Sequence, residues 1–140
     1  MASGIYNNIK AELMKKTIDL VNDTVNVALM AVGHGFTATH DTWADVSANE
    51  IAAIPAIYVA GGQALIGKAV TVDDVDNEGV WDATDIAWGP AATITAYHAV
   101  IYDSTVADDL ICSIDFAGAV TCTNGTFTIV WDTEGIVNLT

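Results

Sequence analysis

The most regular spacing of potential ligand residues lies between positions 74 and 85. Five carboxylates fall at the first, third, fifth, ninth and twelfth positions of this window: Asp74, Asp76, Glu78, Asp82 and Asp85. Carboxylates spaced in this way converge on Ca²⁺ in calcium loops. Glu at the fifth position and Asp at the twelfth depart from that pattern, and the flanking segments resemble strands. The main interpretation is an acidic β-turn in which Gly79 adopts a positive φ angle, and a calcium site is the alternative.

Other constellations that could support catalysis are missing from the sequence. His34, His40 and His98 show no zinc-ligand spacing. No nucleophile elbow, dinucleotide fingerprint or phosphate loop occurs. The chain also contains no arginine to clamp an anionic substrate. We therefore predict a protein that is not an enzyme and that needs no cofactor, apart from the calcium alternative.

The charge of the chain is strongly one-sided. Four lysines face 18 acidic residues, which gives a net charge of -14 and a pI near 4.1. Binding of nucleic acid is not expected, because it requires clustered basic residues. Yet 52% of the residues are hydrophobic and the mean hydropathy is +0.41. This combination suggests a subunit that buries part of its surface against partners.

The aromatic residues support the same interpretation. Interface residues are predicted at Trp43, Pro55, Tyr58, Trp81 and Trp88. Aromatic side chains are common in protein cores and subunit interfaces. The alternative is a carbohydrate-binding face lined by aromatic residues: Trp43, Trp81, Trp88 and Trp131, with Tyr58, Tyr97 and Tyr102.

Patterning predicts a single mainly β domain over residues 1–140. A helix is expected over 4–17 with Ser3 as its N-cap, followed by a strand over 24–32 with one apolar and one modestly polar face. Residues 33–65 are expected to form a long irregular excursion. Residues 68–140 read as a β body of short strands. The fold class is thus an antiparallel β-sandwich or jelly-roll-like body with a short N-terminal α-helix.

Turn and cysteine signals refine this prediction. Gly89–Pro90 and Asn124–Gly125 are expected to form turns between strands. Cys112 and Cys122 are expected to be free, buried thiols, with a disulfide left open. The start of the chain lacks the apolar region of a signal peptide, and no uncharged stretch is long enough to span a bilayer. We expect no association with membranes.

Several short segments resemble, in their order, small virion proteins of tailed bacteriophages. They are Ile5–Lys10, Val25–Met30, Ala60–Leu65, Lys68–Val72, Ile86–Trp88, Thr93–Ala96, Ala99–Asp103 and Gly135–Leu139. Members of this family often carry a basic residue in the stretch that corresponds to Ala96–Tyr97–His98. The histidine at this place puts any shared polar contact there in doubt.

This resemblance implies a structural role in the virion. The expected function is that of a capsid decoration or cement subunit, located in the virion and bound to the major capsid protein or other virion proteins. The resemblance carries over no catalytic residue. Together with the apolar composition, it leads us to expect a homo-oligomer, with a trimer as the expected state. The alternative is a component of the tail, neck or fibre that binds host glycans.

Overall fold

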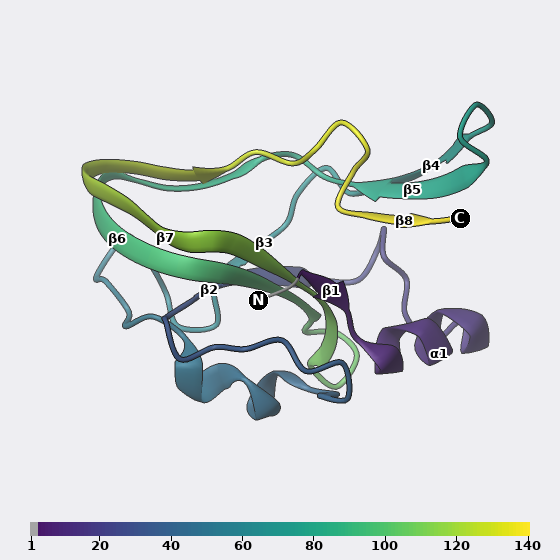
Figure 1. The fold of residues 1–140 in the computed structure, drawn as a ribbon, viewed down its shortest axis with the longest axis horizontal. Coiled ribbons are helices and arrows are strands. Elements are labelled where there is room, and N and C mark those ends of the chain that lie inside the picture. Colours follow the sequence, from purple (N-terminus) through teal and green to yellow (C-terminus); the bar gives the residue numbers. More distant parts are fainter. Residues whose placement is uncertain (1–2) are drawn as a thin grey trace.

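Two antiparallel β-sheets and one α-helix make up residues 3–140, the part of the chain that the computed structural model describes (Figure 1). The elements are β1 (Gly4–Ile5), α1 (Asn7–Lys15), β2 (Val25–Met30), β3 (Gln63–Ala64), β4 (Ala69–Asp73), β5 (Glu78–Asp82), β6 (Ile86–Asp103), β7 (Asp109–Ile129) and β8 (Val137–Leu139). One sheet has the order β1-β7-β6-β2-β3, and the smaller sheet has the order β4-β5-β8. The prediction of a mainly β, antiparallel, sandwich-like body with a short N-terminal helix is confirmed.

The long hairpin of β6 and β7 folds over on itself and forms both layers of the body (Figure 1). Phe116 and Phe127 lie on the same strand, where extended residues this far apart in sequence would be separated by about 36 Å. Their ring centroids are nevertheless only 6.2 Å apart. The hairpin must therefore bend sharply between these two residues, which encloses a core between its halves.

Both predicted turns lie inside these strands, so the expectation of turns was wrong. Gly89–Pro90 belongs to β6 and Asn124–Gly125 belongs to β7, with Ala92 paired to Gly125. The register between the strands shifts here, and Ala91 and Asn124 adopt positive φ angles of 65° and 48°. A β-bulge and a tight turn favour the same residue types, because both require this unusual backbone. These residues lie in irregular pairing within the hairpin instead of ending its strands.

The core is centred on β2, an inner strand of the larger sheet. Val25, Val27, Ala28, Leu29 and Met30 are all fully buried. The predicted polar second face of this strand is therefore wrong. Residues of the 33–65 segment cover it.

That covering segment contains two short 3-10 helices, Trp43–Asp45 and Ser47–Asn49, besides β3. Its Tyr58 hydroxyl accepts a hydrogen bond from the Leu29 backbone N–H at 2.9 Å and donates one to Glu50 Oε1 at 2.7 Å. The first bond joins the irregular segment to β2, and the second links Tyr58 to another residue of the same segment.

Helix α1 is shorter than predicted and begins later. Its N-cap is Tyr6, and Gly4–Ile5 instead pairs with β7 as a short strand. Ser3 is therefore not the N-cap; its hydroxyl accepts a hydrogen bond from the Asp115 backbone N–H at 2.9 Å. The helix ends at Lys15, and its C-cap Lys16 adopts the left-handed conformation. Ile9 is the buried residue that packs the helix against β7.

The two cysteines are free thiols, as predicted. Cys112 is buried, and burial raises the pKa of its thiol to about 12. Cys122 is only half-buried, so the prediction of burial is correct for Cys112 alone. The two residues pair with Ile101 and Ile94 at separate points of β6, so no disulfide joins them.

Candidate functional site

The five carboxylates of the calcium-like spacing do not converge. Asp74 and Asp76 are exposed in the turn between β4 and β5, whereas Glu78 and Asp82 stand at opposite ends of β5. Both carboxylate oxygens of Glu78 accept hydrogen bonds from Asn138 Nδ2 at 3.1 Å. Asp85 Oδ1 accepts one from a backbone N–H of another segment at 3.0 Å.

Residues 3–140 contain no group of three or more His, Cys, Asp or Glu side chains that could hold a metal ion. The β-turn interpretation fits this segment, but Gly79 is not the residue with positive φ. That conformation belongs to Asn77, with φ of 59°.

The predicted interface residues separate into two groups. Tyr58, Trp81 and Trp88 are 1–2% exposed and serve the core of the single chain, so they do not form an exposed interface. Trp43 is half-buried and stacks on Tyr102, with ring centroids 4.7 Å apart. Pro55 is exposed. Trp81 also borders an open cavity.

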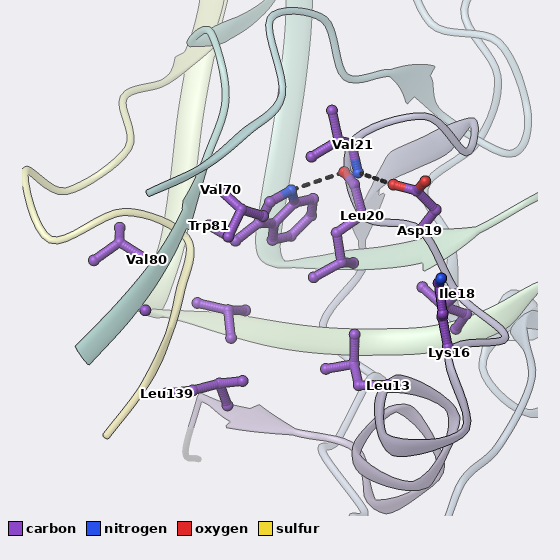
Figure 2. A pocket seen from close by; sticks show the side chains of 12 residues that line it. Leu13, Lys16, Ile18, Asp19, Leu20, Val21, Val70, Val80, Trp81 and Leu139 are labelled. Atoms are coloured by element: carbon purple, nitrogen blue, oxygen red, sulfur yellow. Dashed lines mark hydrogen bonds between the residues drawn. The ribbon is translucent and has the colours of Figure 1, made fainter. Parts of the chain in front are cut away.

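This cavity is an apolar groove between α1 and the smaller sheet (Figure 2). Residue alternation builds its wall: Val70 pairs with Trp81, which pairs with Val137, and these three side chains share one face of the sheet. Leu13 of α1 and the loop residue Leu20 form the opposite wall. The groove holds about 360 Å³, a volume in the range of ligand-binding pockets.

Polar contacts keep the groove walls in place. Trp81 Nε1 donates a hydrogen bond to the Leu20 carbonyl oxygen at 2.9 Å, which ties β5 to the loop after α1. Asp19 Oδ1 accepts bonds from the backbone N–H groups of Val21 and Asn22, both at 3.0 Å. Figure 2 shows the first two of these bonds beside the cavity. The loop is thus held by its own bonds and does not depend on an occupant.

A second cavity of about 420 Å³ continues the groove along α1. It shares four apolar residues with the first: Leu13, Leu20, Val137 and Leu139. Leu139 is 56% exposed and Met14, on the helix side, is 84% exposed. A Cβ added to Gly79 would meet no atom within 4 Å, which also shows that this wall faces open space. We call the two cavities together the α1 groove.

The α1 groove carries much of the positive charge of the molecule. Lys16 borders its first cavity and Lys10 its second. Lys15, on the same helix, is paired with Glu12 at 2.9 Å. Asp19 is the acidic residue that borders the groove, and its carboxylate accepts three hydrogen bonds. A basic edge on an apolar groove thus stands out on a chain with a net charge of -14.

A buried polar cluster lies elsewhere, between β6, β7 and the 33–65 segment. His34 Nε2 is 3.1 Å from Ser113 Oγ, and its ring meets that of His98 with centroids 4.9 Å apart. His98 Nε2 lies 3.5 Å from Asp115 Oδ1. Burial, then the nearby histidines, lower the pKa of His34 to about 4. Because Ser113 is only 1% exposed, its hydroxyl is out of reach of a substrate.

Sequence reasoning missed the α1 groove. The alternation of Val70 and Val72 and the helical spacing of Leu13 are visible in the sequence, but both patterns predict faces that are covered. In the fold, the helix and the smaller sheet border an open cavity instead of packing closely together. The single available signal was the excess of apolar residues over what an acidic monomer needs.

Comparison of the chain with known protein families, with characterised proteins and with solved structures finds no match. No helix within residues 3–140 has the length and apolar character needed to cross a bilayer.

Proposed function

We propose that the chain is a non-enzymatic structural subunit of a bacteriophage virion, and specifically a capsid decoration or cement protein. The observation that carries this proposal is the α1 groove, an open apolar surface on an otherwise acidic chain. The order of short motifs that resembles small virion proteins supplies the biological setting. In this role the subunit stabilises the particle through contacts with neighbouring copies and with the major capsid protein.

The distribution of exposed apolar side chains favours an assembly surface. Six of the eleven large hydrophobic side chains that are exposed in residues 3–140 belong to α1, the loop after it or the smaller sheet and its turn: Met14, Val21, Val70, Val72, Val75 and Leu139. Apolar side chains that gather in this way on a soluble chain mark interaction surfaces. A subunit that assembles covers them.

An uncharged face gives a second argument for self-assembly. Residues 116–131 contain no charged residue, and residues 86–102 contain none apart from His98. Six threonines of the bent hairpin are exposed: Thr93, Thr95, Thr121, Thr123, Thr126 and Thr128. Copies with a charge of -14 repel one another, so contacts are favoured where no carboxylates meet. This supports a homo-oligomer, with a trimer as the proposed state.

Binding of host glycans loses its structural support. Of the rings predicted to form its aromatic face, Tyr58, Trp81 and Trp88 are only 1–2% exposed, and Trp43, Tyr97 and Trp131 are half-buried. We therefore do not propose a receptor-binding module.

The proposal is tested with particles of the source phage that lack this chain. Purified chain added back should co-sediment with the particles and raise their melting temperature. Leu139→Asp, which places a charge in the α1 groove, should weaken binding, whereas Val59→Asp, at a valine that is 68% exposed and outside the groove, should not. Wild-type chain that stays with the supernatant would overturn the proposal.

A further inference from the structure

The turn between β4 and β5 is a compact acidic projection with an apolar tip. Val72 is 78% exposed and Val75 is 87% exposed, the largest exposed fraction among the large hydrophobic side chains described. Asp74 and Asp76 flank Val75 and are exposed. Figure 1 shows this turn extending beyond the body of the molecule, past the end of β8. We call residues 72–76 the hairpin tip.

The hairpin tip is held in one shape without a partner. Asp73 Oδ1 accepts hydrogen bonds from the backbone N–H groups of Val75 and Asp76, at 2.8 and 3.2 Å. Asn77 completes the turn in the left-handed conformation. Val75 is therefore presented to solvent by a preorganised turn, which reduces the entropy lost on binding.

The chemistry of the hairpin tip complements that of the α1 groove. The tip offers two valines between carboxylates, and the groove offers an apolar cavity bordered by Lys10 and Lys16. Val70 of β4 lines the groove of its own chain, whereas Val72 and Val75 do not. The tip thus lies outside its own groove and is available to another copy.

We propose that the occupant of the α1 groove is the hairpin tip of a second copy of this chain. This inference rests on the proposed homo-oligomer and names its contact. Val72 and Val75 enter the groove beside Leu13 and Leu139, while Asp74 and Asp76 face Lys10 and Lys16. When this contact repeats head-to-tail, the copies at the two ends of an open chain keep a free tip or a free groove, and closure of a ring removes both. In a closed ring of three copies, every tip occupies a groove and every groove is occupied.

Charge complementarity favours this occupant over a groove-to-groove dimer. Two grooves that faced each other would bring lysines of one copy towards lysines of the other. The tip-to-groove contact instead joins the acidic tip to the basic edge, and it relieves part of the repulsion between chains of charge -14.

The test uses the full chain, native mass spectrometry and sedimentation velocity. Gly79→Leu fills the groove from its own wall: the glycine does not have a positive φ, and a Cβ there meets no atom. This variant should remain folded and become monomeric. Val75→Asp should raise the dissociation constant of the assembly about tenfold or more, because it removes a valine that the proposed contact buries. Val59→Asp is the matched control and should assemble like the wild type.

Mixing the two defective chains gives the sharpest result. Val75→Asp retains a good groove and Gly79→Leu retains a good tip, so the mixture should form a one-to-one complex that neither variant forms alone. Isotopic labelling of one variant identifies this complex by mass.

Two results would overturn the inference. One is an oligomer that persists unchanged in Gly79→Leu and Val75→Asp, and the other is a monomeric wild-type chain at its highest soluble concentration. A small apolar molecule that co-purifies with the wild type and is lost in Gly79→Leu, without a change in assembly, would assign the groove to a ligand instead. In each case binding to the particle is measured separately, so the proposed virion role is tested independently of this contact.

Discussion

Strands β2 and β4 have the same alternation of valines and opposite surroundings. Val25 and Val27 of β2 are fully buried, whereas Val70 and Val72 of β4 are 56% and 78% exposed. Strand β2 is an inner strand between β6 and β3, and the 33–65 segment covers it. Strand β4 is an edge strand that pairs only with β5. Alternation thus tells which residues share a face but not what covers that face.

The largest expected effect contrasts one leucine from each region. Leu29→Ala removes a fully buried side chain from β2 and should lower the free energy of unfolding by about 2–5 kcal/mol. Leu139→Ala removes the same atoms from β8, where the side chain is 56% exposed, and should change it by less than about 0.5 kcal/mol. Urea unfolding of the monomer measures both. Equal losses would mean that the smaller sheet is covered within the single chain.

The comparison also shows how far the sequence could predict this fold. Strand periodicity was sufficient to predict β6 around Thr93–Tyr102, and helical periodicity was sufficient to predict the helix that contains Ile9. Each pattern continues over several residues. The bend of the hairpin was not predictable, since Asn124–Gly125 favours a turn and a bulge alike. Telling the two apart requires knowing which strand lies opposite, and that is a long-range property.

The candidate site was less predictable than the fold. Local spacing grouped Glu78 with Asp82, but a strand holds these side chains about 13 Å apart along its axis. The residues that do meet, Leu13, Trp81 and Leu139, come from the two ends and the middle of the chain. Their common property is apolarity, which does not distinguish them from core residues in the sequence.

Sensitivity to pH should be concentrated in the larger sheet, where His34 packs on His98 of β6. The pKa of His34 is lowered from 6.5 to about 4, so the unfolded chain takes up protons more readily than the folded chain. The contribution of His34 to the free energy of unfolding is therefore complete above pH 6.5 and is lost as the pH falls to about 4, a total of about 3 kcal/mol. Urea unfolding at a series of pH values should show a steeper loss for the wild type than for His34→Gln. Parallel curves would contradict this assignment.

Asp103, at the end of β6, should act in the opposite direction. Burial, and then the nearby Asp23, raise the pKa of this carboxyl group to about 6. The charged form therefore costs stability at pH 7, and the cost disappears as the pH falls through 6 towards 3.8. Asp103→Asn should raise the free energy of unfolding at pH 7 by about 1–3 kcal/mol and give no gain at pH 4.

The amide substitution preserves the local bonds of this site. Asp103 Oδ1 accepts hydrogen bonds from the backbone N–H groups of Thr105 and Val106 at 2.8 and 3.1 Å, and an amide oxygen can accept both. A loss of stability at pH 7 would show that the carboxylate is needed in its charged form. Asp73 offers a matched control for the amide substitution itself, because its Oδ1 accepts the same type of bonds in the turn after β4.

The smallest expected effect concerns stability of the smaller sheet itself. Gly79→Leu replaces a strand glycine whose added side chain enters the open groove, and it should raise the free energy of unfolding of the monomer by about 1 kcal/mol. The gain arises because the new side chain covers Leu139, the 56% exposed partner of position 79 on β8, from within the chain. Such a gain, measured by urea unfolding below the concentration at which copies assemble, would make β5 resemble β2 in its surroundings. A loss would mean that the face of β5 is already packed, and the contrast between the two sheets would no longer hold.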